Sequence, residues 1–394
     1  MIESLYADIG YQSLTKNGQI VCGDHIEKIQ RPDGSVVLVL ADGLGSGVKA
    51  CVLSTLTATI ISRMVAADLA IPYCVRTIAE ALPVCSQRGL AYSTFTIISI
   101  SPTGKALIVQ YDNPCIALIR DGAEIPIDFT RMTIDEKTIE SAAVQLQKGD
   151  VLLTFSDGAE NAGVAPGMSY EFKWGRDNIV RYIEPLCLAG YSAKTLNTIL
   201  LDECFTRYEG MIGDDTTALT VYMRTREQVN LMFGPPAHEE DVPKMMSLFF
   251  SKSGKHIVCG GTTAKITASY LDTPLVPSTE YIDPDIPPTS KIEGVDLVTE
   301  GILTINRVLE YAKDYLEDNE TYSKWCYKRD GASLLARMLF EEATDINFFV
   351  GRAVNPAHQD PNLSAISFKV KMRLIRELAE CLKQMGKTIR INYF

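Results

Sequence analysis

The chain has 394 residues, of which 46% are hydrophobic and 22% charged, and its formal net charge is −11. A single core rarely grows beyond about 250 to 300 residues, so this length favours two globular domains. The negative charge argues against nucleic acid and membrane surfaces as partners, because binding their phosphates requires clustered lysine and arginine.

The sequence predicts a cytoplasmic protein with reduced thiols. No stretch reaches the roughly 18 to 20 apolar residues that cross a bilayer, and the start MIESLYADIG lacks the features of a signal peptide. The ten cysteines, from Cys22 to Cys381, show no C-x-x-C spacing, which disfavours a zinc site or a disulfide framework.

Strand-like and helix-like segments alternate over the first 225 residues. The strand-like runs are 4–13, 19–29, 35–41, 93–101, 105–111, 115–120, 142–148, 150–156 and 216–223. Helical periodicity covers 46–66, 71–84, 175–188 and 192–208. In the first helix Val48, Val52, Leu53, Leu56, Ile60 and Met64 share one face. Hairpin-like strands interrupted by pairs of helices predict an α+β fold, a four-layer α/β/β/α sandwich of antiparallel sheets.

The local composition changes at 226–236, where the turn-forming residues Gly234-Pro235-Pro236 precede an acidic run. We therefore expect a domain boundary there, with domains at 1–226 and 230–394. Five prolines make 272–289 an extended loop. A second α/β domain is predicted from helices at 242–253, 262–271, 299–316, 330–342 and 364–385 and strands at 256–259, 346–350 and 388–393.

Four aspartates stand beside glycine at strand ends. They lie in Gly23-Asp24, Asp42-Gly43, Asp157-Gly158 and Gly213-Asp214-Asp215. A single Asp-Gly is most often a turn, but an acid that closes a buried strand has to be paired, protonated or metal-bound. Ligand sets made only of oxygen suit Mg²⁺ or Mn²⁺.

Two such ions about 3.5 to 4 Å apart would share a carboxylate and lower the pKa of a bridging water. The metals would also neutralise charge on phosphoryl oxygens. The aspartates therefore predict phosphoester hydrolysis.

The order of the motifs resembles the PPM family of metal-dependent protein serine/threonine phosphatases, in particular the bacterial branch typified by the sporulation stage II E phosphatase. The resemblance spans about residues 4–223. The resemblance rests on five segments, which are CGDHIEKI (22–29), LADGLGSGVKA (40–50), YSTFTIISISPTGKALIVQYDNPCIALIRDGAEIPI (92–127), LQKGDVLLTFSDG (146–158) and GDDTTALTVY (213–222).

The resemblance implies that Asp42 bridges two Mn²⁺ or Mg²⁺ ions and that the Gly43 carbonyl ligates one of them. It implies that Asp24, Asp157 and Asp214 complete the cluster directly or through water, with Asp42 and Asp24 central to catalysis. The glycines would give water, metal and phosphate room to approach. The helix pair at 46–84 resembles a switch element that governs metal occupancy.

Several residues depart from the family pattern or need a second interpretation. Leu44 stands where some members have a histidine, so proton delivery would fall to a metal-bound water. Asn161 replaces an expected acid, which puts a further metal position in doubt. His25 is a second-shell candidate, although a histidine paired with a neighbouring acid is favoured. Asp215 either caps or hydrogen-bonds its turn.

The implied reaction is hydrolysis of phosphoserine or phosphothreonine on a regulatory partner protein in a bacterial signalling pathway. The alternative is a non-enzymatic, ligand- or metal-responsive regulatory module that acts through the C-terminal domain. The substrate's identity and the oligomeric state are left open, a homodimer included.

The second domain suggests no family, and we expect it to be regulatory or substrate-recruiting. The run 259–263 could receive an anion at a helix N-terminus, although a plain strand-to-helix turn is favoured. Four aromatic residues could form a docking surface, although residues at helical spacing more commonly belong to the hydrophobic core. They are Tyr311, Tyr315, Tyr322 and Trp325.

Overall fold

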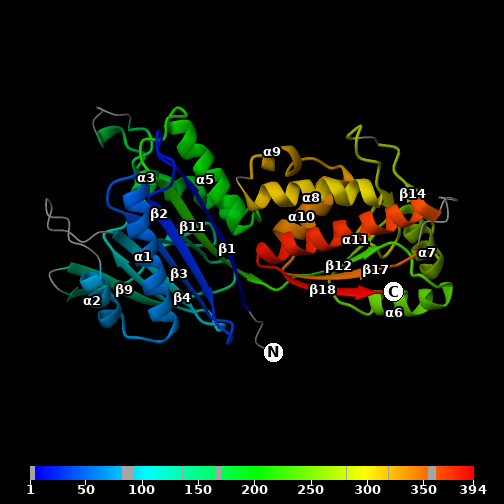
Figure 1. Ribbon diagram of the computed structural model, residues 1–394, viewed down its shortest axis with the longest axis horizontal. Helices are drawn as coiled ribbons and strands as arrows, with labels where there is room; N and C mark the ends of the chain where they lie inside the picture. Colours follow the sequence, from blue (N-terminus) through cyan, green and yellow to red (C-terminus); the bar gives the residue numbers. More distant parts are fainter. Residues whose placement is uncertain are drawn as a thin grey trace. The chain divides into compact units, whose positions relative to one another are not determined.

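The computed structural model describes residues 5–81, 93–134, 137–164, 170–280, 282–317, 319–353 and 361–394 (Figure 1). The chain divides into two compact units, Met1–Thr225 and Arg226–Phe394. The nine cysteines among the described residues are free thiols.

Unit 1 contains two antiparallel sheets, with strand orders β2-β3-β4-β5-β9-β8 and β1-β11-β10-β6-β7. The strands are β1 (Leu5–Leu14), β2 (Asp24–Gln30), β3 (Val36–Gly43), β4 (Ser93–Ile100), β5 (Lys105–Tyr111), β6 (Ala117–Arg120), β7 (Ala123–Ile125), β8 (Thr130–Ile134), β9 (Lys137–Gln145), β10 (Val151–Phe155) and β11 (Thr216–Thr225).

Helices cover the outer face of each sheet. The elements are α1 (Gly47–Ala66) and α2 (Ile71–Ala81) on the six-stranded sheet, and α4 (Arg176–Cys187) and α5 (Ala193–Arg207) on the five-stranded sheet, with the short α3 (Asp157–Glu160) and η1 (Tyr170–Phe172) between β10 and α4. The inner faces of the sheets meet in a third apolar layer that includes Leu38, Ile98 and Leu219. The predicted α/β/β/α sandwich is confirmed.

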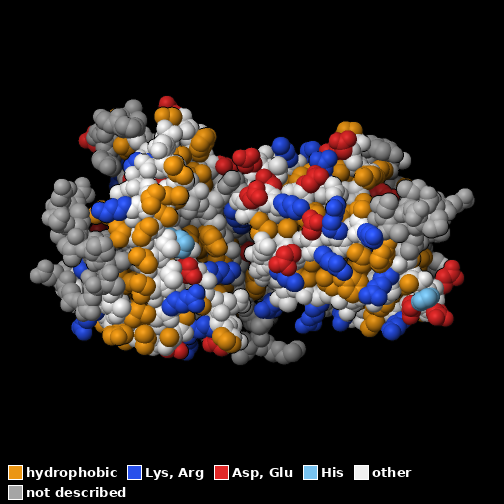
Figure 2. All heavy atoms as spheres, in the orientation of Figure 1, with side chains coloured by type: hydrophobic (Ala, Val, Ile, Leu, Met, Phe, Trp, Pro, Cys, Tyr) orange, Lys and Arg blue, Asp and Glu red, His pale blue; other side chains and the backbone are white. Residues whose placement is uncertain are grey.

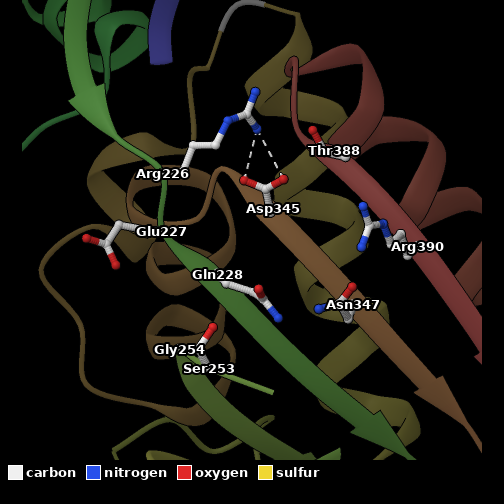
Figure 3. A pocket seen from close by; sticks show the side chains of 9 residues that line it. All are labelled: Arg226, Glu227, Gln228, Ser253, Gly254, Asp345, Asn347, Thr388 and Arg390. Carbon is white, nitrogen blue, oxygen red and sulfur yellow. Dashed lines mark hydrogen bonds and ion pairs between the residues drawn. The ribbon is translucent and has the colours of Figure 1, made fainter. Parts of the chain in front are cut away.

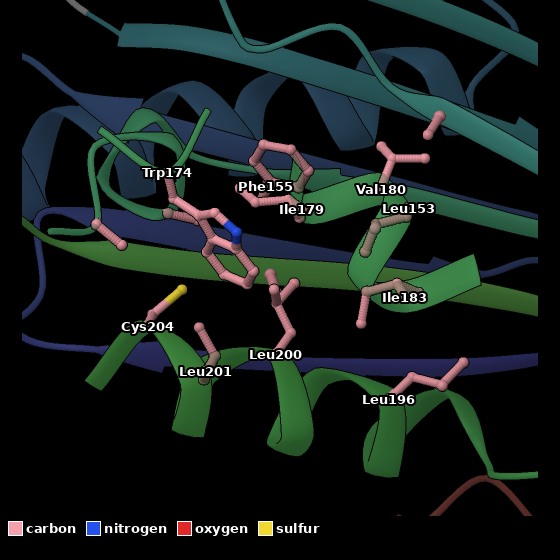
Figure 4. Packing of buried hydrophobic residues seen from close by; sticks show 14 of the residues in the cluster. Leu153, Phe155, Trp174, Ile179, Val180, Ile183, Leu196, Leu200, Leu201 and Cys204 are labelled. Atoms are coloured by element: carbon pink, nitrogen blue, oxygen red, sulfur yellow. The ribbon is translucent and has the colours of Figure 1, made fainter. Parts of the chain in front are cut away.

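Strand β3 explains why these layers hold together. Its six residues from Val36 to Ala41 are all buried, because alternate side chains enter the cores on the two faces of the sheet. Figure 4 shows the other outer core, in which Trp174 and Phe155 pack with Leu200 of α5.

Some predicted bounds in unit 1 were wrong. The strand expected at 142–148 is β9, which begins at Lys137, and the strand expected at 19–29 begins only at Asp24. The short strands β7 and β8 were not predicted. The last residues of the helix expected at 71–84 lie outside the described residues.

The hydrophobic face predicted for α1 is mostly not the buried one, because Leu53 alone among its six residues is buried. Val48, Val52 and Leu56 are 68%, 52% and 44% exposed, and Figure 2 shows a row of hydrophobic side chains along this helix. The buried face instead carries mainly small residues: Gly47, Ala50, Leu53, Ser54, Thr57, Ala58, Ile61, Ser62 and Val65. Small side chains let the helix backbone approach the sheet closely, so size decided the buried face here, not hydrophobicity. By length and hydropathy alone α1 would suffice to cross a membrane, but this face packs in the core.

This packing predicts unequal effects of substitution on the two faces of α1. Ala58→Leu should destabilise the protein by about 1–3 kcal/mol, because Ala58 is fully buried and the added methyl groups overpack the core. Leu56→Gln should change the free energy of unfolding by no more than about 0.5 kcal/mol. Urea unfolding of the full chain measures both, and the reverse order would contradict the placement of the helix.

Unit 2 has a seven-stranded sheet of order β14-β15-β16-β13-β12-β17-β18. The five strands from β16 to β18 pair in parallel, whereas β14 and β15 are antiparallel at one edge. The strands are β12 (Gln228–Phe233), β13 (Lys255–Cys259), β14 (Val276–Pro277), β15 (Ser290–Lys291), β16 (Leu297–Thr299), β17 (Asp345–Val350) and β18 (Thr388–Tyr393).

The first parallel strand, β12, lies in the centre, and later strands extend from it in both directions. Helices therefore cover both faces of the sheet, α6 and α7 one and α8, α10 and α11 the other (Figure 1). The helical elements are η2 (Glu239–Asp241), α6 (Val242–Phe250), α7 (Gly261–Leu271), α8 (Ile302–Leu316), α9 (Tyr322–Trp325), α10 (Gly331–Arg337), η3 (Met338–Glu342) and α11 (Pro361–Gln384). The predicted second α/β domain is confirmed, and its sheet is doubly wound.

Differences from the sequence prediction fall on short elements. The central strand β12 occupies part of the expected boundary segment, and β16 ends where the helix at 299–316 was expected to begin. The helix expected at 330–342 ends at Arg337 and continues as a π turn. The aromatic group of Tyr311, Tyr315, Tyr322 and Trp325 is buried and packs on itself, so it belongs to the core.

Candidate metal centre

Two candidate aspartates face each other across the β2–β3 pair. Asp24, the first residue of β2, lies directly opposite Asp42, near the end of β3. Because β3 is buried along its length, it holds Asp42 on a rigid support at the edge of the six-stranded sheet.

The other two aspartates come from the five-stranded sheet. Asp157 begins α3 just after β10 ends, and Asp214 precedes β11, the neighbour of β10. Burial, followed by repulsion from Asp24, Asp157 and Asp214, raises the pKa of Asp42. The pKa of Asp157 is likewise raised, by burial and then by Asp214. The four carboxyls, far apart in sequence, therefore form one electrostatically coupled group.

Two buried carboxylate oxygens at this site, one of Asp24 and one of the neighbouring Asp215, have no hydrogen-bond partner among the described residues. Asp24 accepts a hydrogen bond from Ser156 Oγ at 2.7 Å through Oδ2, but its Oδ1 is unpaired. Asp215 accepts from the Lys16 backbone N–H at 2.9 Å through Oδ1, and its Oδ2 is unpaired. Both residues are at most 5% exposed, so each free oxygen requires a proton or a cation.

The outer part of the cluster carries one positive charge. Lys16 Nζ lies 3.2 Å from Asp214 Oδ1, and about a third of each of these side chains is exposed. Among the four predicted ligands Asp157 is exposed, Asp42 and Asp214 are half-buried, and Asp24 is the most deeply buried.

Sequence reasoning missed some supporting residues. Ser156, in the predicted segment TFSDG, fixes Asp24 and also accepts from the Thr217 N–H at 2.9 Å. The Tyr208 hydroxyl donates to the Gly158 carbonyl at 2.7 Å and so holds the turn that carries Asp157. No local motif marks Tyr208. Asp215 does more than cap its own turn, because it anchors the segment that contains Lys16.

The glycines beside the aspartates are required by close packing of the chain. A Cβ on Gly43 would lie 2.1 Å from the Ala50 carbonyl oxygen in α1, and one on Gly158 would lie 2.1 Å from the Asp215 carbonyl oxygen. A Cβ on Gly23 would lie 2.7 Å from Asp215 Oδ2. The expectation that the glycines around Asp42 leave room for water and phosphate is therefore wrong for Gly43, whereas a Cβ on Gly45 would meet no atom within 4 Å.

Gly43→Ala should therefore destabilise unit 1 by about 2–3 kcal/mol, because backbone of α1 has to move away from the end of β3. Urea unfolding measures this effect, and the same variant should bind Mn²⁺ more weakly because Asp42 would shift. Wild-type stability in this variant would contradict the close packing of α1 on β3.

The structure also shows the surroundings of three residues next to the predicted ligands, His25, Glu160 and Leu44. His25 Nε2 lies 3.4 Å from Glu27 Oε2, and as the next residue in β2 it points to the opposite face from Asp24. Glu160 pairs with Lys173 at 2.6 Å. Leu44 is 37% exposed beside the cluster.

Among the described residues, no group of three or more histidine, cysteine, aspartate or glutamate side chains is arranged to hold one ion. The repulsion among the carboxyls and the two unpaired oxygens nevertheless favour a cation bound between these side chains.

Comparisons with known proteins give one family. The family model of stage II sporulation protein E (SpoIIE) matches residues 32–224. No curated protein matches the sequence.

Several solved structures are similar to parts of the chain at low identity. The phosphatase domain of the cell fate determinant SpoIIE from Bacillus subtilis is 19% identical, with a TM-score of 0.43, over 57% of this chain and 95% of that one. The RsbU and RsbW domains of Rv1364c from Mycobacterium tuberculosis are 14% identical, with a TM-score of 0.49, over 84% and 78% of the two chains. An RsbX structure in complex with magnesium is 16% identical, with a TM-score of 0.39, over 57% and 97%.

Proposed function

Unit 1 of this chain is a SpoIIE-like domain of the PPM phosphatase type, and from that premise we propose that the protein is a metal-dependent protein serine/threonine phosphatase. The proposed reaction is hydrolysis of phosphoserine and phosphothreonine. The observation that carries the proposal is the coupled group of Asp24, Asp42, Asp157 and Asp214, which draws on both sheets.

The residues that would hold two Mn²⁺ or Mg²⁺ ions are these four aspartates and the Gly43 carbonyl. Carboxylate and carbonyl oxygens are the ligands such ions prefer, and they commonly keep water among their ligands. When bound, the ions supply an activated water at neutral pH and neutralise charge on the phosphoryl group.

The protein's own groups position this chemistry. Asp42 is held by a fully buried strand, and Asp24 is fixed by the hydrogen bond from Ser156. Lys16, at the accessible side of the cluster, provides a positive charge that attracts the phosphate of an incoming side chain. Leu44 offers no proton to the leaving alkoxide, so that proton comes from solvent in this proposal.

The partner we propose is a phosphorylated regulatory protein in the cytoplasm of a bacterium. The SpoIIE family match and the net charge of −11 support a protein substrate over nucleic acid. A homodimer is compatible with this proposal and is not required by it.

The test uses the full chain with p-nitrophenyl phosphate, a phosphoserine peptide and a phosphotyrosine peptide, in Mn²⁺ and in EDTA. We expect Mn²⁺ to raise turnover of the first two by roughly 100-fold or more over EDTA, with little hydrolysis of phosphotyrosine. Absence of metal-dependent turnover, also with a phosphoprotein mixture as substrate, would overturn the proposal and favour the non-enzymatic regulatory module.

A further inference from the structure

Unit 2 contains a cavity of about 430 Å³ at the ends of its parallel strands. The lining residues include Gly234 after β12, Gly260 after β13, Glu300 and Gly301 after β16, Thr263 of α7 and Lys371 of α11. In doubly wound sheets, ligands bind outside the carboxyl ends of the strands, where the strand order reverses. This cavity lies at that position, and its volume is within the usual range for small-molecule sites.

Lys371 brings a buried positive charge to the cavity. Its side chain is 8% exposed, and its Nζ donates to the Gly351 carbonyl and lies 5.3 Å from the ring centroid of Phe233. Among the described residues no carboxylate forms an ion pair with it, and burial lowers its pKa to about 8. A buried ammonium without a counter-charge is costly, so an anion in the cavity would stabilise it.

Lys371 also marks the point where the strand order reverses. A Cβ on Gly234 would lie 1.9 Å from Lys371 Nζ, so the ammonium occupies the space beside the glycine that ends β12. Its acceptor, Gly351, directly follows β17, the strand on the other side of this point.

Two helix N-termini and an unpaired hydroxyl add donors. In α7 the first helical bond runs from the Ala264 N–H to the Gly260 carbonyl, which leaves the N–H groups of 261–263 free of helical bonds. In α8 the equivalent bond runs from Ile305 to Gly301. Thr263 is 1% exposed, and its Oγ1 has no partner among the described residues. That oxygen faces the cavity turn, because a Cβ on Gly260 would lie 3.4 Å from it.

Lys265 and Glu300 complete the charged lining of the cavity. The Glu300 carboxylate is exposed and accepts from the Gly301 N–H, so it lies at the rim and remains able to accept from a ligand hydroxyl. Ile302, Leu303 and Phe368 give the rest of the lining an apolar surface. Positive charge, free N–H groups and an apolar wall suit a phosphate attached to an organic group.

A second cavity, of about 440 Å³, lies at the opposite ends of the same strands (Figure 3). Two of its charged residues are already paired, since Arg226 donates to both Asp345 carboxylate oxygens at 3.1 Å. Asn347 likewise donates to Asn230 at 2.9 Å. The cavity beside Lys371 differs from it in containing a buried ammonium without a counter-charge and a buried hydroxyl without a partner among the described residues.

We propose that the cavity beside Lys371 binds a phosphate-bearing small molecule, with the phosphate between Lys371, Thr263 and the N-terminus of α7. The sugar or other hydroxyl-bearing part would face Glu300. The turn after β12 reads Gly234-Pro235-Pro236 and lacks the G-x-G-x-x-G pattern, and the cavity volume suits a mononucleotide or phosphosugar better than a dinucleotide. Unit 2 would then report the level of such a ligand.

The test is calorimetric titration of the full chain in EDTA, so that no metal recruits phosphate to the aspartate cluster of unit 1. The probes are inorganic phosphate, ribose 5-phosphate, AMP and adenosine. We expect the phosphate-bearing probes to bind and adenosine to bind at least tenfold more weakly than AMP. AMP binding more tightly than ribose 5-phosphate identifies a nucleotide, and equal binding identifies a phosphosugar; either supports the site.

Substitutions in the cavity test whether the probes bind there. Lys371→Met should weaken AMP roughly tenfold or more, and Thr263→Val about fivefold. Thr263→Val keeps the side-chain shape and removes a hydroxyl that has no partner, so it should fold normally and keep the test valid if Lys371→Met does not. Lys244→Met, at an exposed lysine of α6, is the matched control. Saturable binding that neither cavity variant changes would overturn the proposal, as would no binding of any phosphate-bearing probe by the folded wild type.

Discussion

Replacing Asp42 with asparagine is expected to lower Mn²⁺-dependent phosphatase turnover by roughly 10³-fold or more. The substitution keeps the shape of the side chain but removes the negative charge at the centre of the coupled carboxyl group. A neutral amide cannot hold two divalent cations as a shared carboxylate does. Steady-state turnover of p-nitrophenyl phosphate and a phosphoserine peptide at saturating Mn²⁺ measures the loss.

The matched control for this experiment is Asp128→Asn, the same change at an exposed aspartate of unit 1 outside the cluster. Its turnover should equal that of the wild type. Thermal unfolding should show that both variants are folded. More than about a tenth of wild-type turnover in a folded Asp42→Asn protein would remove Asp42 from the metal centre.

The second large effect concerns the metal-free protein, which should become less stable as pH rises. Burial raises the pKa values of Asp24 and Asp42 above that of an unfolded aspartate, and repulsion adds to this, from Asp215 for Asp24 and from Asp24 and Asp157 for Asp42. The folded state therefore holds a proton that the unfolded state releases above about pH 4. This contribution is complete below the unfolded pKa and is lost as pH rises toward the folded pKa values.

While the folded state holds one proton more than the unfolded state, the free energy of unfolding falls by about 1.4 kcal/mol per pH unit. In EDTA it should therefore fall by roughly 3 kcal/mol between pH 5.5 and 8. Urea unfolding at several pH values measures this slope. Mn²⁺ should reverse the loss, because the cation replaces the proton between the carboxylates.

Asp42→Asn provides the comparison that isolates the cluster. It removes one of the repelling charges, so its metal-free form should have a flatter pH profile and exceed the wild type in stability near pH 8. It should also lose most of the stabilisation by Mn²⁺. Equal slopes in the two proteins would show that other groups cause the pH dependence.

The sequence predicted the layers of unit 1 because its strands are long and strongly apolar. It could not predict which face of α1 is buried, since hydrophobic periodicity pointed to Val48, Val52 and Leu56, and these are exposed. Ala50 and Ala58 are buried because the helix lies close to β3, which is a property of tertiary packing. Short strands such as β7 and β16, of three residues each, are too brief to show a period.

The candidate site was predictable only in part. The Asp-Gly pairs signalled the four aspartates, but no local pattern indicates that Ser156 fixes Asp24 or that Tyr208 holds the Asp157 turn. Those contacts join residues 50 to 132 positions apart. At the start of unit 2 the segment 226–236 was interpreted as a domain boundary, and this concealed β12, the central strand on which the sheet order and the cavity beside Lys371 depend.

The pairing of β1 with β11 joins Leu5–Leu14 to Thr216–Thr225, the two ends of unit 1. A ribosome must therefore release more than two hundred residues before the five-stranded sheet can close, and β1 waits during synthesis with its pairing edge open. Contacts so distant in sequence form slowly and leave apolar strands vulnerable to aggregation. In unit 2 the central strand β12 pairs with β17, 117 positions later, so its sheet closes after a shorter delay. Nascent chains of this protein should therefore depend on chaperones chiefly while unit 1 is being made.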